Sequence, residues 1–267
     1  MKRAAAVAAC TLVVACAGLG GPPPQTAEAP PGYLPPDRMD ALTAQAGTWA
    51  DDGDLAASQT LQGLEDTDRW WLATAHAEIR PPEAAQHFDC VLGTRLSARP
   101  RPALTRIMHR LLVDSATLTA RLAGSNPRSR PIALDPSRRA CQRVTEDQRS
   151  GGSWPAAAAV AGAAYGELFA GLAPDRADAA RAMGREIGIS RAVCAMNWPS
   201  DVEDGRRLGQ AVYEQAAAAP DFHAELEAAR MELASARAER LGSPACAAER
   251  RALGTNDQAG RGLTSEP

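Results

Sequence analysis

The sequence contains almost no lysine. Lys2 is the only lysine among 267 residues, so the basic side chains are otherwise arginines. If the first 15 residues are a signal that is removed, Lys2 and Arg3 leave with it, and 27 of the 29 basic residues face 32 acidic ones, a net charge of about −5. Proteins that bind nucleic acids neutralise phosphates with lysine and arginine. We therefore expect no nucleic-acid partner.

Histidine is also scarce, and no metal-binding pattern is present. The four histidines, His76, His87, His109 and His223, are far apart in the sequence and form no Cys/His cluster with the spacing of metal ligands. We interpret them as surface or half-buried side chains without a ligand role, and we predict neither a metal nor a cofactor.

The N-terminus is typical of an exported protein. Residues 1–15 combine a basic start with a short apolar run, which predicts a secretory signal peptide that is too short to remain as a membrane span. The stretch that ends at Cys16 resembles a bacterial lipobox, in which the cysteine receives a lipid, although Cys10 shows that this signal also contains an unrelated cysteine. We predict a periplasmic protein, either free or anchored to the outer membrane through Cys16.

The remaining chain shows helical periodicity and no convincing alternation of apolar and polar residues. We predict an all-α protein with a proline-rich tether at 16–50, one helical domain at 51–241 and a polar tail at 242–267. One apolar stripe, with Leu104, Ile107, Leu111 and Leu118 at helical spacing, indicates a long core-facing helix. Expected helices span residues 66–78, 82–92, 102–122, 155–172, 174–194, 199–218 and 220–241, and residues 124–152 read as an irregular connection.

Apart from Cys16, the lipid-acceptor candidate, four cysteines remain after the signal: Cys90, Cys141, Cys194 and Cys246. In an oxidising compartment an even number of cysteines favours disulfides over metal ligation. Three connectivities are open, and we favour Cys141 with Cys194 and Cys90 with Cys246, because the first pair lies beside two segments that carry unusual motifs.

Those motifs belong to three ordered segments: SNPRSRP at 125–131, GGSWPAAAA at 151–159 and SRAVCAMNWPSD at 190–201. With RWWLA at 69–73 and SDVEDGRRLGQAV at 200–212, they resemble the bacterial class A non-specific acid phosphatases of the phosphatidic acid phosphatase type 2 and vanadium haloperoxidase superfamily. The resemblance covers about residues 55–240 and implies the helical domain of that superfamily.

The resemblance also implies a phosphate site built from three motifs. The first is Lys, six residues, Arg-Pro; the second is Pro-Ser-Gly-His; the third is Ser-Arg, five residues, His, three residues, Asp. In the family the third-motif histidine attacks phosphorus, the aspartate orients it, the second-motif histidine protonates the leaving oxygen, and the lysine and arginines hold the phosphate. A nucleophile, an acid and a cationic cradle are the separate needs of phosphoryl transfer.

This chain departs from the family at the residues that perform the chemistry. In the first motif Arg130 is kept, and the lysine position is Ala123, where Arg121 or Arg128 would have to supply charge. The hydroxyl and acid of the second motif are replaced by an alanine run, and the third motif keeps Ser190, Arg191 and Asp201 around an asparagine. The altered positions are Ala123, Ala156, Ala157, Ala158 and Asn197.

An amide nitrogen is not a nucleophile, because its lone pair is delocalised into the carbonyl, so Asn197 cannot repeat the covalent step. We therefore expect no intact catalytic residue. A phosphate-binding function is the part that survives, held by Arg130 and Arg191, with Arg128 as a further candidate, and by the free N–H groups of the helix that starts near Pro155.

Each of these residues also has a purely structural interpretation. Asn197 is a favoured N-cap ahead of the helix that starts at Pro199, with Asp201 in its first turn. Ser153 is suited to cap the helix at Pro155, and Arg191 to pair with Asp201.

Three hypotheses about function follow. The first is an exported, acid-phosphatase-like pseudoenzyme that still binds phosphate, a phosphorylated small molecule or a protein partner. The second is an active acid phosphatase that hydrolyses phosphomonoesters with substitute residues such as His87 or His109. The third is a structural envelope lipoprotein without a ligand.

Overall fold

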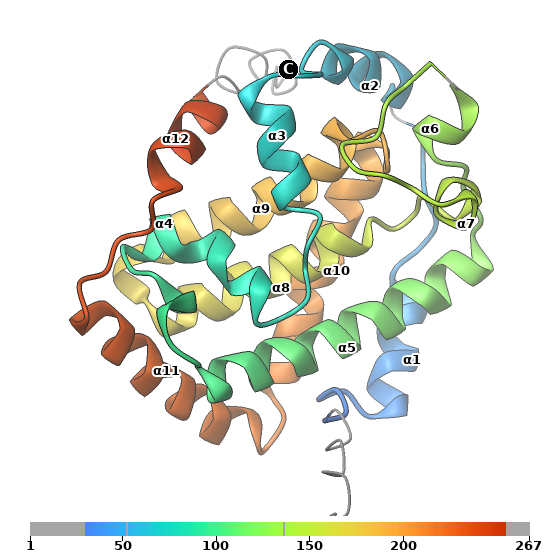
Figure 1. Ribbon diagram of the computed structural model, residues 1–267. Coiled ribbons are helices and arrows are strands. Elements are labelled where there is room, and N and C mark those ends of the chain that lie inside the picture. Colours follow the sequence, from blue (N-terminus) through green and yellow to red (C-terminus); the bar gives the residue numbers. More distant parts are fainter. Residues whose placement is uncertain (1–29, 52, 136, 255–267) are drawn as a thin grey trace, which may run out of the picture.

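Helix α8 (Ala157–Leu172) runs through the centre of the computed structural model, which describes residues 30–51, 53–135 and 137–254. It lies between α9 (Ala177–Val193), α10 (Pro199–Ala217) and α5 (Pro102–Ser125) (Figure 1). The backbones of α9 and α10 both lie close to that of α8. A Cβ atom added to Gly209 of α10 would lie 2.1 Å from the Val160 carbonyl oxygen of α8, and one added to Gly184 of α9 would lie 2.4 Å from that of Gly162. Glycine at these positions therefore lets the backbones touch.

The long helix with the apolar stripe is α5, and its apolar face is buried as predicted. Leu104, Ile107, Leu111 and Leu118 are at most 1 % exposed. Pro102 occupies the first turn, where a missing N–H costs nothing. The next free N–H groups donate to the carboxylate of Glu232 on α11 (Phe222–Ala238), which lies along α5.

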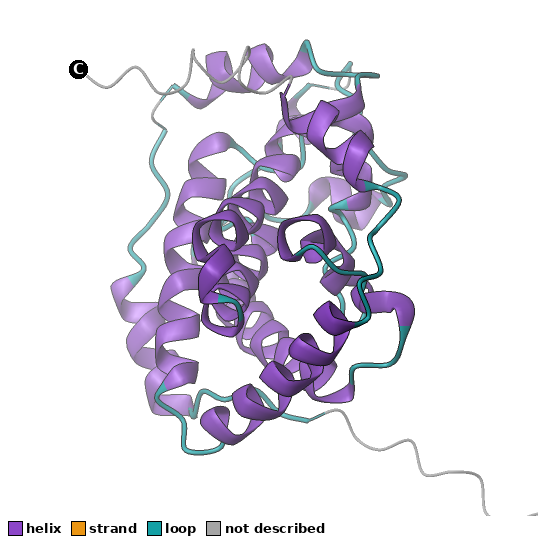
Figure 2. Ribbon diagram, turned by 90° about the vertical axis from the view of Figure 1, so that its left-hand side faces the viewer, coloured by secondary structure: helices purple, strands orange, loops and turns teal. Residues whose placement is uncertain are grey.

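The described residues form twelve α-helices, three 3₁₀ segments and no strand, so the all-α prediction is confirmed (Figure 2). The remaining elements are α1 (Pro36–Gln45), α2 (Asp54–Gln62), α3 (Asp68–Ala75), η1 (Glu83–Phe88), α4 (Asp89–Leu92), η2 (Leu96–Ala98), α6 (Pro131–Leu134), α7 (Glu146–Ser150), η3 (Pro174–Arg176) and α12 (Cys246–Gly254). No helix within the described ranges has the length and apolar character that crossing a membrane requires.

The structure corrects several expected boundaries. Residues 36–45, assigned to the tether, form α1, because Met39 and Leu42 are buried in a cluster with Leu118 and Leu122 of α5. Helix α2 was not predicted, and α6, α7 and α12 form in segments read as a loose connection and a polar tail. Residues 82–92 divide into η1 and α4. The predicted signal peptide and Cys16 lie outside the described residues.

Two disulfides join Cys90 to Cys246 and Cys141 to Cys194, the connectivity that we favoured. The first fastens the start of α12 to α4. The second holds the connection that follows α6 against the end of α9. Closing loops of this length stabilises the folded chain by restricting the unfolded one.

Candidate functional site

The three motif segments come together where α9 ends and where α8 and α10 begin. The Ser153 N–H donates to the Arg128 carbonyl at 2.7 Å, and the Ala156 N–H donates to the Asp201 carbonyl at 3.1 Å. A third link is the bond from the Trp198 indole N–H to the Ser129 carbonyl at 2.8 Å. Backbone groups of all three segments are therefore joined to one another, as their resemblance to a single site predicted.

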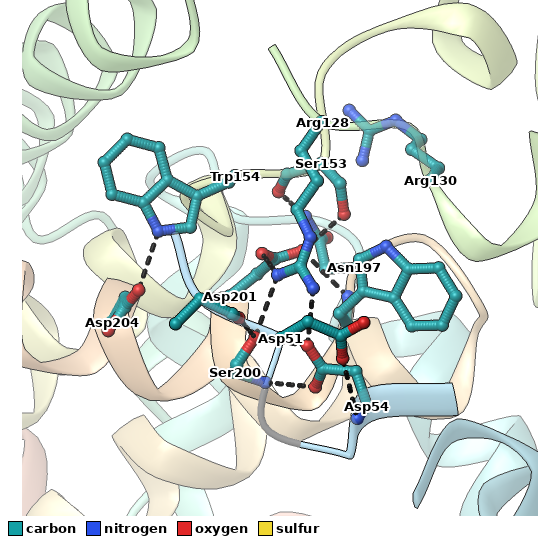
Figure 3. Close-up of polar contacts among 12 residues, drawn as sticks. Asp51, Asp54, Arg128, Arg130, Ser153, Trp154, Asn197, Ser200, Asp201 and Asp204 are labelled. Carbon is teal, nitrogen blue, oxygen red and sulfur yellow. Dashed lines mark hydrogen bonds and ion pairs between the residues drawn. The ribbon is translucent and has the colours of Figure 1, made fainter. Parts of the chain in front are cut away.

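Arg128 is held by carboxylates at the centre of this region (Figure 3). Its guanidinium lies 2.5 Å from an Asp201 oxygen and 2.6 Å from an Asp54 oxygen, and it also donates to the Ser200 hydroxyl at 2.8 Å. The side chain is buried between two carboxylates, so its charge is already neutralised. These two ion pairs count against Arg128 as the further candidate for holding phosphate.

Asp201 anchors the start of α10 and the entrance to α8. One carboxylate oxygen accepts from the Trp198 N–H at 2.9 Å and from the Ser153 hydroxyl, while the other pairs with Arg128. Burial raises the pKa of Asp201, and the hydrogen bonds from Ser153 and Trp198 and the charge of Arg128 oppose that rise. The structural alternative in which Arg191 pairs with Asp201 is wrong, because Arg128 takes that place.

Neither polar residue expected to cap a helix does so. The Asn197 amide donates to the Ser153 carbonyl, and the N-cap of α10 is Trp198. The Ser153 hydroxyl donates to Asp201, and α8 begins two residues after Pro155, at Ala157, with no side-chain cap. No side chain caps the N-terminus of α8, and Ala157 in its first turn is exposed. The first N–H groups of α8 therefore have no side-chain acceptor.

Arg191, on the last turn of α9, differs from Arg128 in its surroundings. Its side chain is buried, and within the described ranges no hydrogen bond or ion pair reaches its guanidinium. Burial, together with the positive charge of Arg130, lowers its pKa to about 10. A buried cation beside another cation is unfavourable unless an anion joins them.

Arg130 is the second cation. One of its terminal nitrogens donates to the Met196 carbonyl at 2.6 Å, and its Nε is buried without a hydrogen-bond partner among the described residues. Burial lowers the pKa of Arg130, and the charge of Asp201 opposes this shift without forming an ion pair. Figure 3 shows Arg130 apart from the carboxylates that surround Arg128. Arg130 and Arg191, which we call the free arginine pair, therefore have an excess of positive charge.

Two of the altered positions, Ala156 and Ala158, are buried among apolar side chains. Ala158, at the position where the resemblance implies an acid, is buried in the main hydrophobic cluster. Ala123 faces the loop before α8, since a Cβ added to Gly152 would lie 3.5 Å from the Ala123 Cβ. Arg121 does not replace the missing lysine, because it pairs with Asp40 of α1 on the surface.

No histidine contacts the free arginine pair or Asp201 in the described residues, and His76 reaches the region only through the Ser190 hydroxyl. His76 and His87 are buried rather than surface or half-buried: they contact each other edge to face, and they bond to the Ser190 hydroxyl and the Glu78 carbonyl at 2.8 Å. No contact in the described part of the chain joins any histidine to Arg130, Arg191 or Asp201. That same part holds no group of three or more histidines, cysteines or carboxylates arranged for a metal ion.

Sequence reasoning missed Asp54, whose carboxylate is the second partner of Arg128 and also accepts from the Ser200 N–H at 2.9 Å. It also missed Arg69, a fully buried arginine that donates to the Ser190 hydroxyl at 2.9 Å and pairs with Glu186 at 3.1 Å. Asp54 lies in a polar stretch that reads as a surface loop, so no local signal marks it.

No protein-family model matches the chain. It is similar to an acid phosphatase of Zymomonas mobilis, with 29% identity over 209 residues that cover 77% of this chain and 75% of the relative. A non-specific acid phosphatase of Salmonella typhimurium is 27% identical over 172 residues, covering 64% and 68%. A non-specific acid phosphatase of Providencia stuartii is 25% identical over 173 residues, covering 64% and 69%. These similarities support the acid phosphatase family and a phosphomonoesterase-like function.

Proposed function

We propose that this chain is a degenerate member of the class A acid phosphatases and of their phosphatidic acid phosphatase type 2 superfamily: it binds phosphate or a small phosphorylated molecule and does not hydrolyse it. The observation that carries the proposal is the free arginine pair, with Arg191 buried, Arg130 half-buried and neither paired with a carboxylate, at the position where the motif segments meet. The relatives named acid phosphatase support phosphate esters as the ligand class.

The binding half of the proposal follows from charge. A phosphate oxygen accepts charge-assisted hydrogen bonds from guanidinium groups, with Arg191 supplying the unpaired donors and Arg130 the nearest second charge. The uncapped N-terminus of α8 adds N–H groups that favour an anion.

The loss of catalysis follows from two side chains. Asn197 uses its amide N–H on the Ser153 carbonyl, so the nucleophile position is occupied by a group that holds two segments together. Ala158 leaves no proton donor for the departing oxygen, and loss of a general acid alone costs about 10²–10⁴ in rate. His87 bonds to the Glu78 carbonyl and His109 lines a separate groove, so both lie away from the free arginine pair, which counts against the hypothesis of substitute catalytic residues.

We place this function outside the cytoplasm, in the periplasm or on a membrane surface through a lipid on Cys16. The two disulfides support an oxidising compartment. Mass spectrometry of the protein purified from its own membranes tests this: an acylated N-terminal Cys16 supports the anchor, and an unmodified soluble chain contradicts it.

Binding is tested by thermal denaturation with increasing inorganic phosphate, at ionic strength matched with chloride. A ligand at about ten times its Kd stabilises by about 1.4 kcal/mol, which raises the Tm of a chain of this size by roughly 2–4 °C. Arg191→Gln is expected to remove the shift, and Arg185→Gln, which alters an exposed arginine elsewhere on α9, is expected to keep it. No shift with the wild type would leave the third hypothesis, a structural lipoprotein.

Catalysis is tested with p-nitrophenyl phosphate on the wild type and on a chain with Ala123→Lys, Ala156→Ser, Ala157→Gly, Ala158→His and Asn197→His. We expect no turnover by the wild type. Activity only in the substituted chain would show that the chemistry was lost from a working scaffold, whereas turnover by the purified wild type would contradict the proposal.

A further inference from the structure

A second feature lies away from the free arginine pair. A cavity of about 680 Å³ opens between η1, η2 and the first turns of α5, and none of the motif residues lines it. Its floor is apolar, with Ala85, Leu96 and Leu104 buried beneath it. Pro82, Pro100 and Pro102 form further apolar walls. Its size falls in the range of small-molecule sites, roughly 300–1,000 Å³.

The same groove contains polar atoms that lack partners. Arg101 lines it with a side chain that is only 9% exposed; a terminal nitrogen pairs with Glu239 at 2.6 Å, and its Nε is buried without a hydrogen-bond partner in the described residues. The Nδ1 of His109, in the same wall, is also buried and unpartnered within those ranges. Both atoms are closed off from solvent, so recognition of a ligand falls to the arginine charges that line the groove.

The charge of the groove favours an anion. Three arginines line it, Arg99, Arg101 and Arg106, against one acid, Glu83. Glu239 serves both Arg99, at 3.5 Å, and Arg101, so it neutralises one charge of the two. Arg106 is exposed at the rim.

We propose that this groove binds an amphiphile of the fatty-acid class, with one apolar chain and an anionic head group. The chain lies over Ala85, Leu96 and Leu104, and the head group faces the charges of Arg101 and Arg106. This site is independent of phosphate binding by the free arginine pair.

Calorimetric titration of the full chain with decanoate, below its micelle concentration, tests the proposal. Decanol, which has the same chain without the charge, is the matched ligand, and we expect decanoate to bind about tenfold more tightly. Inorganic phosphate is expected not to compete. Ala98→Trp, which places a large side chain in the groove, is expected to weaken decanoate binding by more than about tenfold.

Arg106→Glu changes an exposed residue and leaves the fold intact, so it keeps the test valid if the tryptophan variant is unstable. It is expected to weaken decanoate roughly three- to tenfold and to leave decanol unchanged, while Arg185→Glu on α9 changes neither.

Three results would overturn the proposal. The first is a folded wild type that binds no decanoate. The second is equal affinity for decanoate and decanol, which removes the role of the arginines. The third is a dimer in light scattering that Ala98→Trp converts to a monomer, which would make a second copy of the chain the occupant.

Discussion

Two arginines in the same region are buried to almost the same degree, Arg128 with 8% and Arg191 with 9% of its surface exposed, yet their surroundings are opposite. Arg128 lies between Asp54 and Asp201, whereas Arg191 has no carboxylate and faces Arg130. Burial alone therefore does not reveal what a charged side chain does. Whether a carboxylate is paired with it decides between a role in stabilising the fold and a role in binding an anion.

The contrast also explains the positions of the two residues. Arg128 joins α2, the segment after α5 and the start of α10, so three parts of the chain depend on one guanidinium. Arg191 extends from the last turn of α9, and the fold would lose no ion pair without it. If this comparison is right, the two arginines must respond oppositely to replacement.

The largest expected effect is on Arg128. Arg128→Met leaves Asp54 and Asp201 buried without their cation, and breaking a buried pair in this way costs about 3–5 kcal/mol. Urea denaturation of the variant and the wild type measures the loss. Arg185→Met, at an exposed position of α9, is expected to stay within about 0.5 kcal/mol of the wild type. A loss below about 1 kcal/mol for Arg128→Met would break the comparison.

Much of this molecule is predictable from local patterns. Helical periodicity identifies seven of the helical segments, and the stripe on α5 is buried as its spacing requires. The order of the motif segments predicts that they meet, and the backbone bonds from Ser153 to Arg128 and from Ala156 to Asp201 agree with this. The disulfides follow from the proximity of Cys141 and Cys194 to those segments.

The exchange of roles between Arg128 and Arg191 is not predictable, because it depends on Asp54 from a helix that the pattern does not reveal. Capping preferences also fail at Asn197 and Ser153. Those preferences describe a side chain and its own helix. Here Asn197 bonds to the Ser153 carbonyl 44 positions away, and the Ser153 hydroxyl bonds to Asp201 48 positions away. Long-range contacts between loops leave no periodic trace in a sequence.

The second effect has the opposite sign. Arg191→Met replaces the arginine with an unbranched apolar side chain and so removes an unpaired buried charge. We therefore expect the free energy of unfolding in phosphate-free buffer to rise by about 1–3 kcal/mol. The same variant should no longer be stabilised by phosphate. Urea denaturation with and without phosphate measures both quantities on one sample.

A loss of stability in Arg191→Met comparable to that in Arg128→Met would mean that Arg191 has a structural partner in solution. The two arginines would then be equivalent, and the free arginine pair would no longer support an anion site. Arg130→Met separates these cases further, because Arg130 keeps one bond to the Met196 carbonyl and should fall between the two.

The smallest expected effect concerns an unpaired negative charge in place of the unpaired positive charge of Arg191. Glu249, on α12, is a partly buried carboxyl whose pKa rises to about 7, through burial first and then through the negative charge of Asp89, with Arg250 opposing. Its ordinary pKa is 4.5, so between pH 4.5 and 7 the folded chain holds a proton that the unfolded chain has released. Stability from this group is therefore complete below about pH 4.5 and is lost as the pH rises to about 7.

Because Glu249 remains partly open to solvent, the expected loss is about 1 kcal/mol between pH 5 and pH 7.5. Urea denaturation at the two pH values measures it. Glu249→Gln removes the titrating group and keeps the side-chain shape, so the variant should lose about 1 kcal/mol less than the wild type over this pH range. Burial also raises the pKa of Asp89, which contributes in the same direction to both chains. If the free energy of unfolding changes equally with pH in the two chains, α12 exposes Glu249 to water. An unpaired charge would then destabilise this fold only where the surrounding helices keep it buried, as at Arg191.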